Sequence, residues 1–147
     1  MQDKVFFSGG HYVATVKGEA LSVEPTVGWL VLSNGKRVQV KRAFVNAATN
    51  ATTELIPAQA TFVYRILTMF ALGGGTAPTV TLKSNTTAIS PVLAFPANGG
   101  AVLGPNLWGW FQTLLLNDAL NVTVTSSSDV GIIVNYIELT DDLVDLL

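Results

Sequence analysis

The chain has 147 residues, of which 12% are charged and 49% are hydrophobic, with a mean hydropathy of +0.45. That charged fraction is about half of what a soluble domain carries, so a lone copy is expected to leave more apolar surface in water than monomers tolerate. The absence of cysteine excludes disulfides and thiolate zinc sites, and the net charge of −2 gives no general attraction to nucleic acid or anionic lipid.

The N-terminal part of the chain differs from the remainder. Glycine and proline divide it into short pieces, among which residues 11–16 and 29–33 have strand-like composition. We interpret residues 1–37 as an arm or a set of added hairpins. Residues 38–147 then form a single all-β domain, an antiparallel sandwich that ends in a short acidic tail.

Basic residues are concentrated at the junction of these two parts. As a strand, this segment turns Val38 and Val40 inward and its cations outward. No aromatic residue is interleaved to stack on bases, so an acidic protein surface is a better partner for it than nucleic acid. The four cations, which are half of those in the chain, are Lys36, Arg37, Lys41 and Arg42.

Residues 61–72 predict a central strand with apolar side chains on both faces. A sandwich strand needs an apolar face on its inner side only, so we interpret the second face as a subunit contact. The first face comprises Phe62, Tyr64, Ile66, Phe70 and Leu72. The second face comprises Val63, Leu67, Met69 and Ala71.

Strict alternation of apolar and polar residues at 80–83 and 120–125 predicts two half-buried strands. Residues 130–140 predict another central strand, and the leucines at 114–116 favour a short buried strand. Glycine-, asparagine- and serine-rich segments supply turns between these runs. This spacing is typical of an all-β sandwich or jelly roll.

Two tryptophans, Trp108 and Trp110, flank Gly109. If the segment is extended, both rings lie on one face, where they serve either as an interface anchor or as a platform for sugar rings. Buried or interfacial tryptophan is the more common of these roles, and both alternatives stay open here.

Catalytic, metal and membrane functions have little support in the sequence. Its single histidine, His11, follows Ser8 without a nucleophile elbow or an orienting acid, so we expect no enzyme and no cofactor. The acidic tail lacks the pattern of a calcium loop. Apolar stretches are interrupted before the ~18 residues that a spanning helix needs, and no secretory signal is visible, so no membrane partner is expected.

Several motifs between residues 38 and 140 together resemble a known group of proteins. They are residues 80–90, 97–100, 102–103, 109–111, 118–123, 130–132 and 136–138. The set is similar to the small head decoration, or cement, proteins of tailed bacteriophages, which have a jelly-roll-like β-sandwich. Asn85 stands where such sequences often have glycine, and the first 37 residues and the acidic tail lie outside the resemblance.

The resemblance implies a virion structural protein, assembled in the host cytoplasm, that binds the outer surface of an assembled head. Its partners would be the major capsid protein and copies of itself, with a trimer favoured. The alternative is a carbohydrate-binding module or a receptor-binding fibre tip, because sandwiches often have that role. Candidate capsid or subunit contacts are Lys36, Arg37, Lys41, Arg42, Val63, Leu67, Met69, Trp108 and Trp110.

Overall fold

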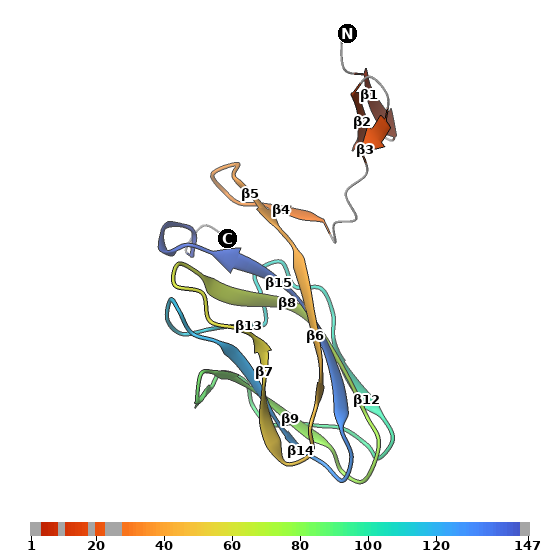
Figure 1. Cartoon of the computed structure of the whole chain (residues 1–147), viewed down its shortest axis with the longest axis vertical. Helices are drawn as coiled ribbons and strands as arrows, with labels where there is room; N and C mark the ends of the chain where they lie inside the picture. Colours follow the sequence, from red (N-terminus) through yellow and green to blue (C-terminus); the bar gives the residue numbers. More distant parts are fainter. Residues whose placement is uncertain (1–3, 9–10, 18–19, 23–27, 145–147) are drawn as a thin grey trace.

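The structure is a computed structural model that describes residues 4–8, 11–17, 20–22 and 28–144 (Figure 1). Its regular elements are almost all strands, followed by one short 3-10 helix, η1 (Asp141–Leu143). The first strands are β1 (Lys4–Ser8), β2 (His11–Lys17), β3 (Ala20–Ser22), β4 (Trp29–Val31), β5 (Arg37–Gln39), β6 (Lys41–Ala47), β7 (Ala51–Ile56) and β8 (Val63–Gly73). The others are β9 (Thr79–Ser84), β10 (Thr87–Ala88), β11 (Leu93–Ala94), β12 (Gly100–Leu103), β13 (Phe111–Gln112), β14 (Leu120–Thr125) and β15 (Val130–Leu139).

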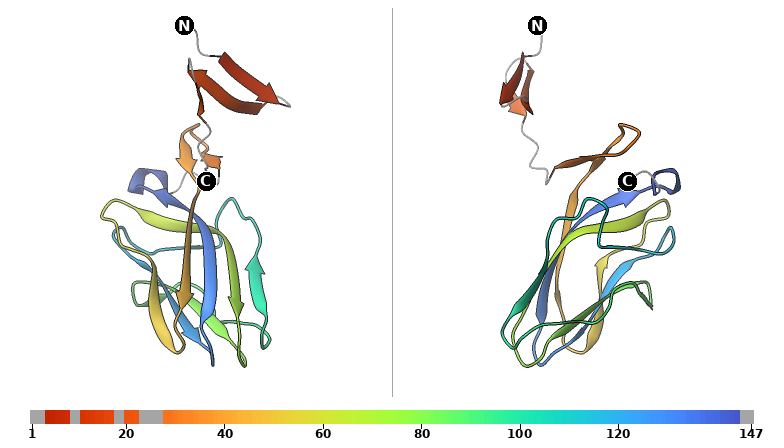
Figure 2. Two further views of the ribbon diagram at one scale, coloured as in Figure 1. Left: turned by 45° about the vertical axis from the view of Figure 1, so that its right-hand side comes forward. Right: turned by 180° about the vertical axis from the view of Figure 1, so that it is seen from behind.

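Two antiparallel sheets face each other and form a sandwich, which confirms the predicted fold class. Sheet I has the strand order β12-β8-β15-β6, with β13 also paired to β8, and its strands lie side by side in one layer (Figure 2). Sheet II has the order β10-β9-β14-β7, with β11 also paired to β9. Strands β1 to β3 form a separate antiparallel sheet of their own, and β4 pairs with β5 in a hairpin.

The main core lies between the inner faces of the two sheets. Alternation in β9 and β14 places their valines and leucines inward and their threonines at the surface, as predicted. On the opposite sheet, Tyr64 and Tyr136 meet edge to face with ring centroids 5.7 Å apart. The largest fully buried side chains include Ile66, Met69, Leu82, Leu120, Ile132, Val122 and Val124.

A β-bulge in β8 changes which of its side chains reach this core. Asn135 of β15 pairs with Thr68 and Tyr136 pairs with Ile66, so Leu67 has no partner in the ladder. Because side chains alternate with a period of two, one extra residue exchanges the two faces of the strand. Tyr64 and Ile66 point inward before the bulge, and Met69 and Ala71 point inward after it. The predicted division of β8 into two continuous faces is therefore wrong.

A second, smaller core covers one end of the outer face of sheet I. The β4–β5 hairpin packs its Leu30, Leu32 and Val38 on this end, together with Leu143 of η1. These side chains bury the outward residues of the underlying strands, which are Val63, Leu67, Ile137 and Leu139. The boundary predicted after residue 37 falls within β5, because the hairpin that packs on the sandwich begins at Trp29.

The short run of leucines before β14 does not form the expected strand. Leu114, Leu115 and Leu116 lie in a bend and turn and are exposed. The turn is closed by the backbone of Asp118, whose amide donates to the Leu115 carbonyl at 3.3 Å. The buried Asp118 carboxylate also accepts from the Leu115 amide at 3.2 Å, so a polar contact beyond the run holds its conformation, which apolar periodicity alone cannot predict.

Candidate functional site

An apolar row crosses the open part of the outer face of sheet I. Ile133 of β15 pairs with Phe44 of β6 on one side and with Phe70 of β8 on the other, and Phe70 pairs in turn with Val102 of β12. The four side chains thus lie at one level on four adjacent strands. Phe44 is 78% exposed and Val102 is 67% exposed, whereas Phe70 and Ile133 are about 40% exposed.

With Leu72, which is 54% exposed on β8, the row forms the apolar face patch. Its five side chains expose roughly 500 Å² of apolar surface when typical side-chain areas are taken. The largest such patch on a monomeric protein is about 300–600 Å² and is often functional. Within the described residues, the sandwich therefore completes its own core and still leaves this apolar surface exposed.

A polar row separates the apolar face patch from the end of the sheet that the hairpin covers. Arg42 donates from Nε to Asn135 Oδ1 at 3.0 Å, and Asn135 Nδ2 donates to Thr68 Oγ1 at 2.9 Å. This chain of hydrogen bonds crosses β6, β15 and β8 next to the bulge. It gives the apolar face patch a polar rim on that side, which is the usual composition of a protein interface.

The face is hollowed beside the row, over β15, β8 and β12. This hollow, of about 310 Å³, is bordered by the exposed apolar side chains Phe70 and Val102 and by Arg42 of the polar row. Leu103 and Pro105, at the end of β12 and just beyond it, complete the wall. Phe44 is not among the residues that line the hollow.

The predicted basic segment does not form one continuous patch. Lys36 and Arg37 are exposed on the β4–β5 hairpin. Lys41 instead donates from Nζ to Glu138 Oε2 at 2.7 Å across the sheet, and Arg42 belongs to the polar row described above. A break at Val40 between β5 and β6 separates the two pairs of cations.

Three of the predicted contact residues are covered inside the chain. Val63 and Leu67 lie under the hairpin, and Met69 lies in the main core with 1% exposure. The interpretation of these side chains as a subunit contact is therefore corrected. The bulge instead turns Phe70 and Leu72 outward, so the open face of the same strand is formed by residues that the sequence pattern places in the core.

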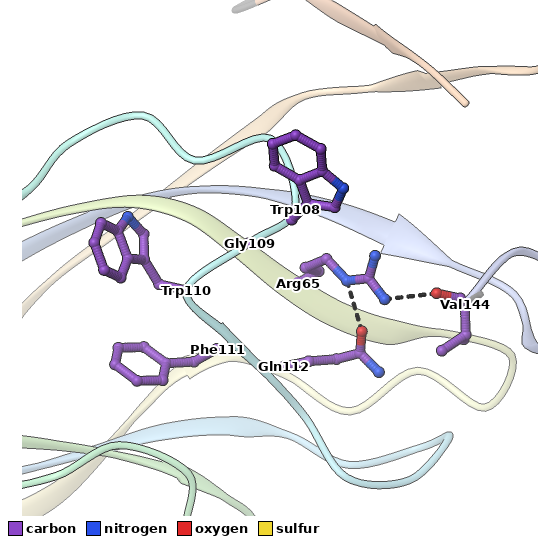
Figure 3. A pocket seen from close by; sticks show the side chains of 7 residues that line it. All are labelled: Arg65, Trp108, Gly109, Trp110, Phe111, Gln112 and Val144. Atoms are coloured by element: carbon purple, nitrogen blue, oxygen red, sulfur yellow. Dashed lines mark hydrogen bonds between the residues drawn. The ribbon is translucent and has the colours of Figure 1, made fainter. Parts of the chain in front are cut away.

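The two tryptophans lie in the loop between β12 and β13 and do not form an extended pair. Gly109 has a φ of +84°, and its amide closes a turn by donating to the Asn106 carbonyl at 2.9 Å. Figure 3 shows the two indole rings apart, on either side of Gly109. Trp108 is 73% exposed, and Trp110 donates from Nε1 to the Gly104 carbonyl at 2.7 Å.

These rings border a hollow of about 360 Å³ that has a polar floor. Arg65 donates from Nε to Gln112 Oε1 and from its terminal nitrogen to the Val144 carbonyl, both at 2.7 Å (Figure 3). The guanidinium group is thereby held between β8, β13 and the segment after η1. An exposed aromatic ring beside fixed polar groups is a suitable contact for a planar or sugar-like ligand.

Few groups capable of catalysis or metal binding are found in the described part of the chain. Strand pairing places Ser8 opposite His11 at the tip of the β1–β2 hairpin. Within residues 4–8, 11–17, 20–22 and 28–144, no group of three or more histidine, aspartate or glutamate side chains is placed to hold a metal ion. Over the same ranges no helix has the length and apolar character needed to cross a membrane. The tail residue Asp145 lies outside the described residues.

No protein-family model matches this chain. No curated protein matches it significantly either. The surfaces described above are therefore the basis for a proposal about its function.

Proposed function

We propose that the chain is a structural protein of a tailed-bacteriophage virion that binds the outside of the assembled head and stabilises contacts between capsomers. The observation that carries this proposal is the apolar face patch, which stays open although the sandwich has a complete core. A partner protein is the natural cover for such a surface. The resemblance of residues 38–140 to head decoration proteins suggests the same role.

We further propose that the sandwich is a jelly roll. The two sheets have the spatial orders β6-β15-β8-β12 and β7-β14-β9-β10. The chain crosses between the layers from β6 to β9 at every step, again between β11 and β12, and twice more between β13 and β15. Two four-stranded sheets linked in this manner are the pattern of a double Greek key, which occurs in viral capsid and lectin domains. The strand order thus supports the architecture that the resemblance implies.

Decoration of this kind requires binding but no covalent chemistry. A standard interface buries ~1,600 Å², a little over half of it apolar, and this burial contributes a gross binding free energy on the order of 20 kcal/mol. Most of that free energy is offset by the ordering of side chains and the loss of rigid-body freedom. An oligomer that binds through several equivalent contacts gains avidity, so each contact is weak while the set is strong. The trimer that the resemblance favours fits this scheme.

The exposed cations of the hairpin supply a contact for the head itself. Lys36 and Arg37 project from the β4–β5 hairpin, at the end of the sandwich away from the apolar face patch. An acidic surface of the major capsid protein is the complement for them. The two surfaces then have different partners, namely sister copies for the apolar face patch and the shell for the hairpin.

Co-sedimentation with phage heads tests this function. Purified protein is mixed with heads that lack it, and the bound fraction is measured as salt rises. We expect saturable binding at hundreds of copies per head, weakened by salt and by the double substitution of Lys36 and Arg37 to glutamate. Absence of binding, together with absence of the polypeptide from purified virions by mass spectrometry, would refute the proposal.

A second candidate function is binding of carbohydrate at the hollow beside Trp108. The exposed indole offers a stacking surface, and Arg65 and Gln112 present polar groups next to it. Titration with saccharides while tryptophan fluorescence is followed distinguishes the two functions. Saturable quenching that is lost in Trp108→Ala would favour the saccharide role, whereas binding to heads that is unaffected by this substitution would favour decoration.

A further inference from the structure

Phe44 is the most prominent apolar side chain of sheet I. It lies on the edge strand β6 and is 78% exposed, more than any other large hydrophobic residue in the described part of the chain. Its neighbours on the outward side of the same strand, Arg42 and Asn46, are polar. A single protruding aromatic ring between polar residues has the form of an interface anchor, which requires a pocket on its partner.

The same face carries a pocket of suitable size and chemistry. The hollow beside the row is bordered by Phe70, Val102, Leu103 and Pro105 and has room for a phenyl ring, since a cavity of about 150 Å³ suffices to bind benzene. Phe44 of the same copy lies two strands away from Phe70 and contributes nothing to the lining. Anchor and pocket are thus both present on one copy, and the anchor does not fill the pocket of its own copy.

We infer that Phe44 of one copy inserts into the hollow over β15, β8 and β12 of a second copy. This contact assigns the surface through which the proposed oligomer forms. It rests on the proposed function for the number of copies in that oligomer. The apolar face patch then mediates self-association, and other surfaces of the chain contact the shell.

The strand register favours a closed ring. Phe44 and Val102 lie at opposite edges of sheet I but at one level along the strands, because each is linked through Ile133 and Phe70 in the same row. Copies related by rotation about an axis parallel to the strands therefore bring the Phe44 side of one sheet to the Val102 side of the next. Such head-to-tail contacts form a ring when the rotation closes, as in a trimer.

Arg42 is positioned to receive the incoming ring. It borders the hollow, and its Nε is held by Asn135, which is itself bonded to Thr68. A guanidinium group fixed in this manner can lie over the face of the phenyl ring from the neighbouring copy. The contact thereby uses the polar row as well as the apolar side chains.

In a ring, the exposed apolar area of each copy is shared between two contacts. A standard interface buries about 800 Å² on each partner, of which a little over half is apolar, or roughly 450 Å². The apolar face patch exposes roughly 500 Å², as estimated above from typical side-chain areas. Each contact thus receives roughly 250 Å² of this apolar surface from one copy, about half of the apolar area of a standard interface, with the polar row as part of its rim.

Two substitutions and their mixture test the contact on the full-length protein without phage heads. Phe44→Asp removes the anchor, and Val102→Asp blocks the pocket. Molar mass is measured by light scattering over a range of concentrations. We expect an oligomer for the wild type and monomers for each variant, with circular dichroism spectra that keep the β-sheet signal. Val92→Asp, at a position 65% exposed between β10 and β11 of the other sheet, is the matched control and keeps the oligomer.

An equimolar mixture of the two variants gives the decisive readout. One variant retains an intact pocket and the other an intact anchor, so we expect a 1:1 dimer joined through a single contact. A monomeric wild type, an unchanged mass for either variant, or a mixture that stays monomeric would each overturn the inference. Because mass is measured without heads, failure here is distinguishable from failure of the proposed decoration function, which appears only as lost co-sedimentation.

Discussion

Asn85 donates a hydrogen bond from Nδ2 to Asp118 Oδ1 at 2.5 Å, which joins the β9–β10 turn to the loop before β14. Asn85 has a φ of +51°, in the left-handed region where glycine and asparagine are favoured. Its Oδ1 also accepts a hydrogen bond from the Ala119 amide at 3.0 Å. Asparagine at this position therefore keeps the turn geometry and adds a link to the loop.

Substitution of Asp118 by alanine tests this link. The carboxylate is buried and also accepts from Ser84 Oγ at 2.5 Å and from the Leu115 amide at 3.2 Å. Loss of a buried acceptor leaves its donors without partners, so we expect a decrease of about 2–4 kcal/mol in the free energy of unfolding. Urea denaturation measures it. Asp141→Ala, at an exposed carboxylate, is the control and should shift stability by less than about 0.5 kcal/mol.

Two truncations test whether the hairpin belongs to the folded body. Removal of residues 1–27 leaves β4 and β5 in place and should preserve stability. Removal of residues 1–35 also takes away Leu30 and Leu32, which cover Leu67 and Ile137. Because each buried leucine contributes about 1.5–3 kcal/mol, we expect a loss of about 3–6 kcal/mol and new binding of a hydrophobic dye. Equal denaturation midpoints for the two truncations would show that the hairpin does not stabilise the sandwich.

The pH dependence of stability follows from Tyr64. Burial, and secondarily the Glu138 carboxylate, raise the pKa of Tyr64 from 10.0 to about 12 in the folded state. The folded state therefore retains a proton that the unfolded state loses, so the stabilisation is complete below pH 10. It decreases between pH 10 and 12 by up to about 1.4 kcal/mol per pH unit. Denaturation at several alkaline pH values measures this slope.

Tyr64→Phe is the matched variant for that experiment. It removes the hydrogen bond from the Tyr64 hydroxyl to the Pro57 carbonyl at 2.6 Å, which costs about 1 kcal/mol at neutral pH. The variant should lose less stability than the wild type between pH 10 and 12. Burial also raises the pKa of Tyr136, so a smaller decrease remains. Parallel curves for the two proteins would contradict the assignment to Tyr64.

Gly109→Ala tests the geometry of the tryptophan loop. A Cβ atom at this position would lie 2.4 Å from Arg65 Cγ, and the φ of +84° is unfavourable for alanine. We expect a loss of about 1–3 kcal/mol and displacement of the Arg65 side chain, seen as shifted indole NH signals in NMR spectra. Gly104→Ala, where a Cβ atom meets nothing within 4 Å, is the control. Unchanged indole signals would contradict the described loop.

Local sequence patterns predict the strands well where one face alone is buried. The alternation in β9 and β14 and the central position of β15 are confirmed because their register is continuous. The faces of β8 are not predictable in this manner, since the bulge at Leu67 depends on its pairing with β15. Similarly, nothing local indicates that Val63 and Leu67 are covered by a hairpin that begins more than 30 positions earlier in the chain.

The candidate site is even harder to predict from the sequence. Phe44, Phe70, Val102 and Ile133 come from four strands that are far apart in the chain, and only the pairing register brings them to one level. One local signal exists, because Phe44 alternates with Arg42 and Asn46 at outward positions of β6. A single exposed apolar residue is common on protein surfaces, so this signal becomes informative only when the register places Phe44 in a row with the other three side chains.

The coverage of sheet I by its own hairpin has a consequence for how copies would align. A neighbour that slides along the strands toward Ile137 meets the packed leucines of β4 and the segment that follows it, so travel in that direction is blocked. For copies that associate through the apolar face patch, as inferred above, the hairpin would fix their relative position along the strands. Without the hairpin, the apolar face patch alone would allow several offsets along the strands, and the spacing between copies would vary.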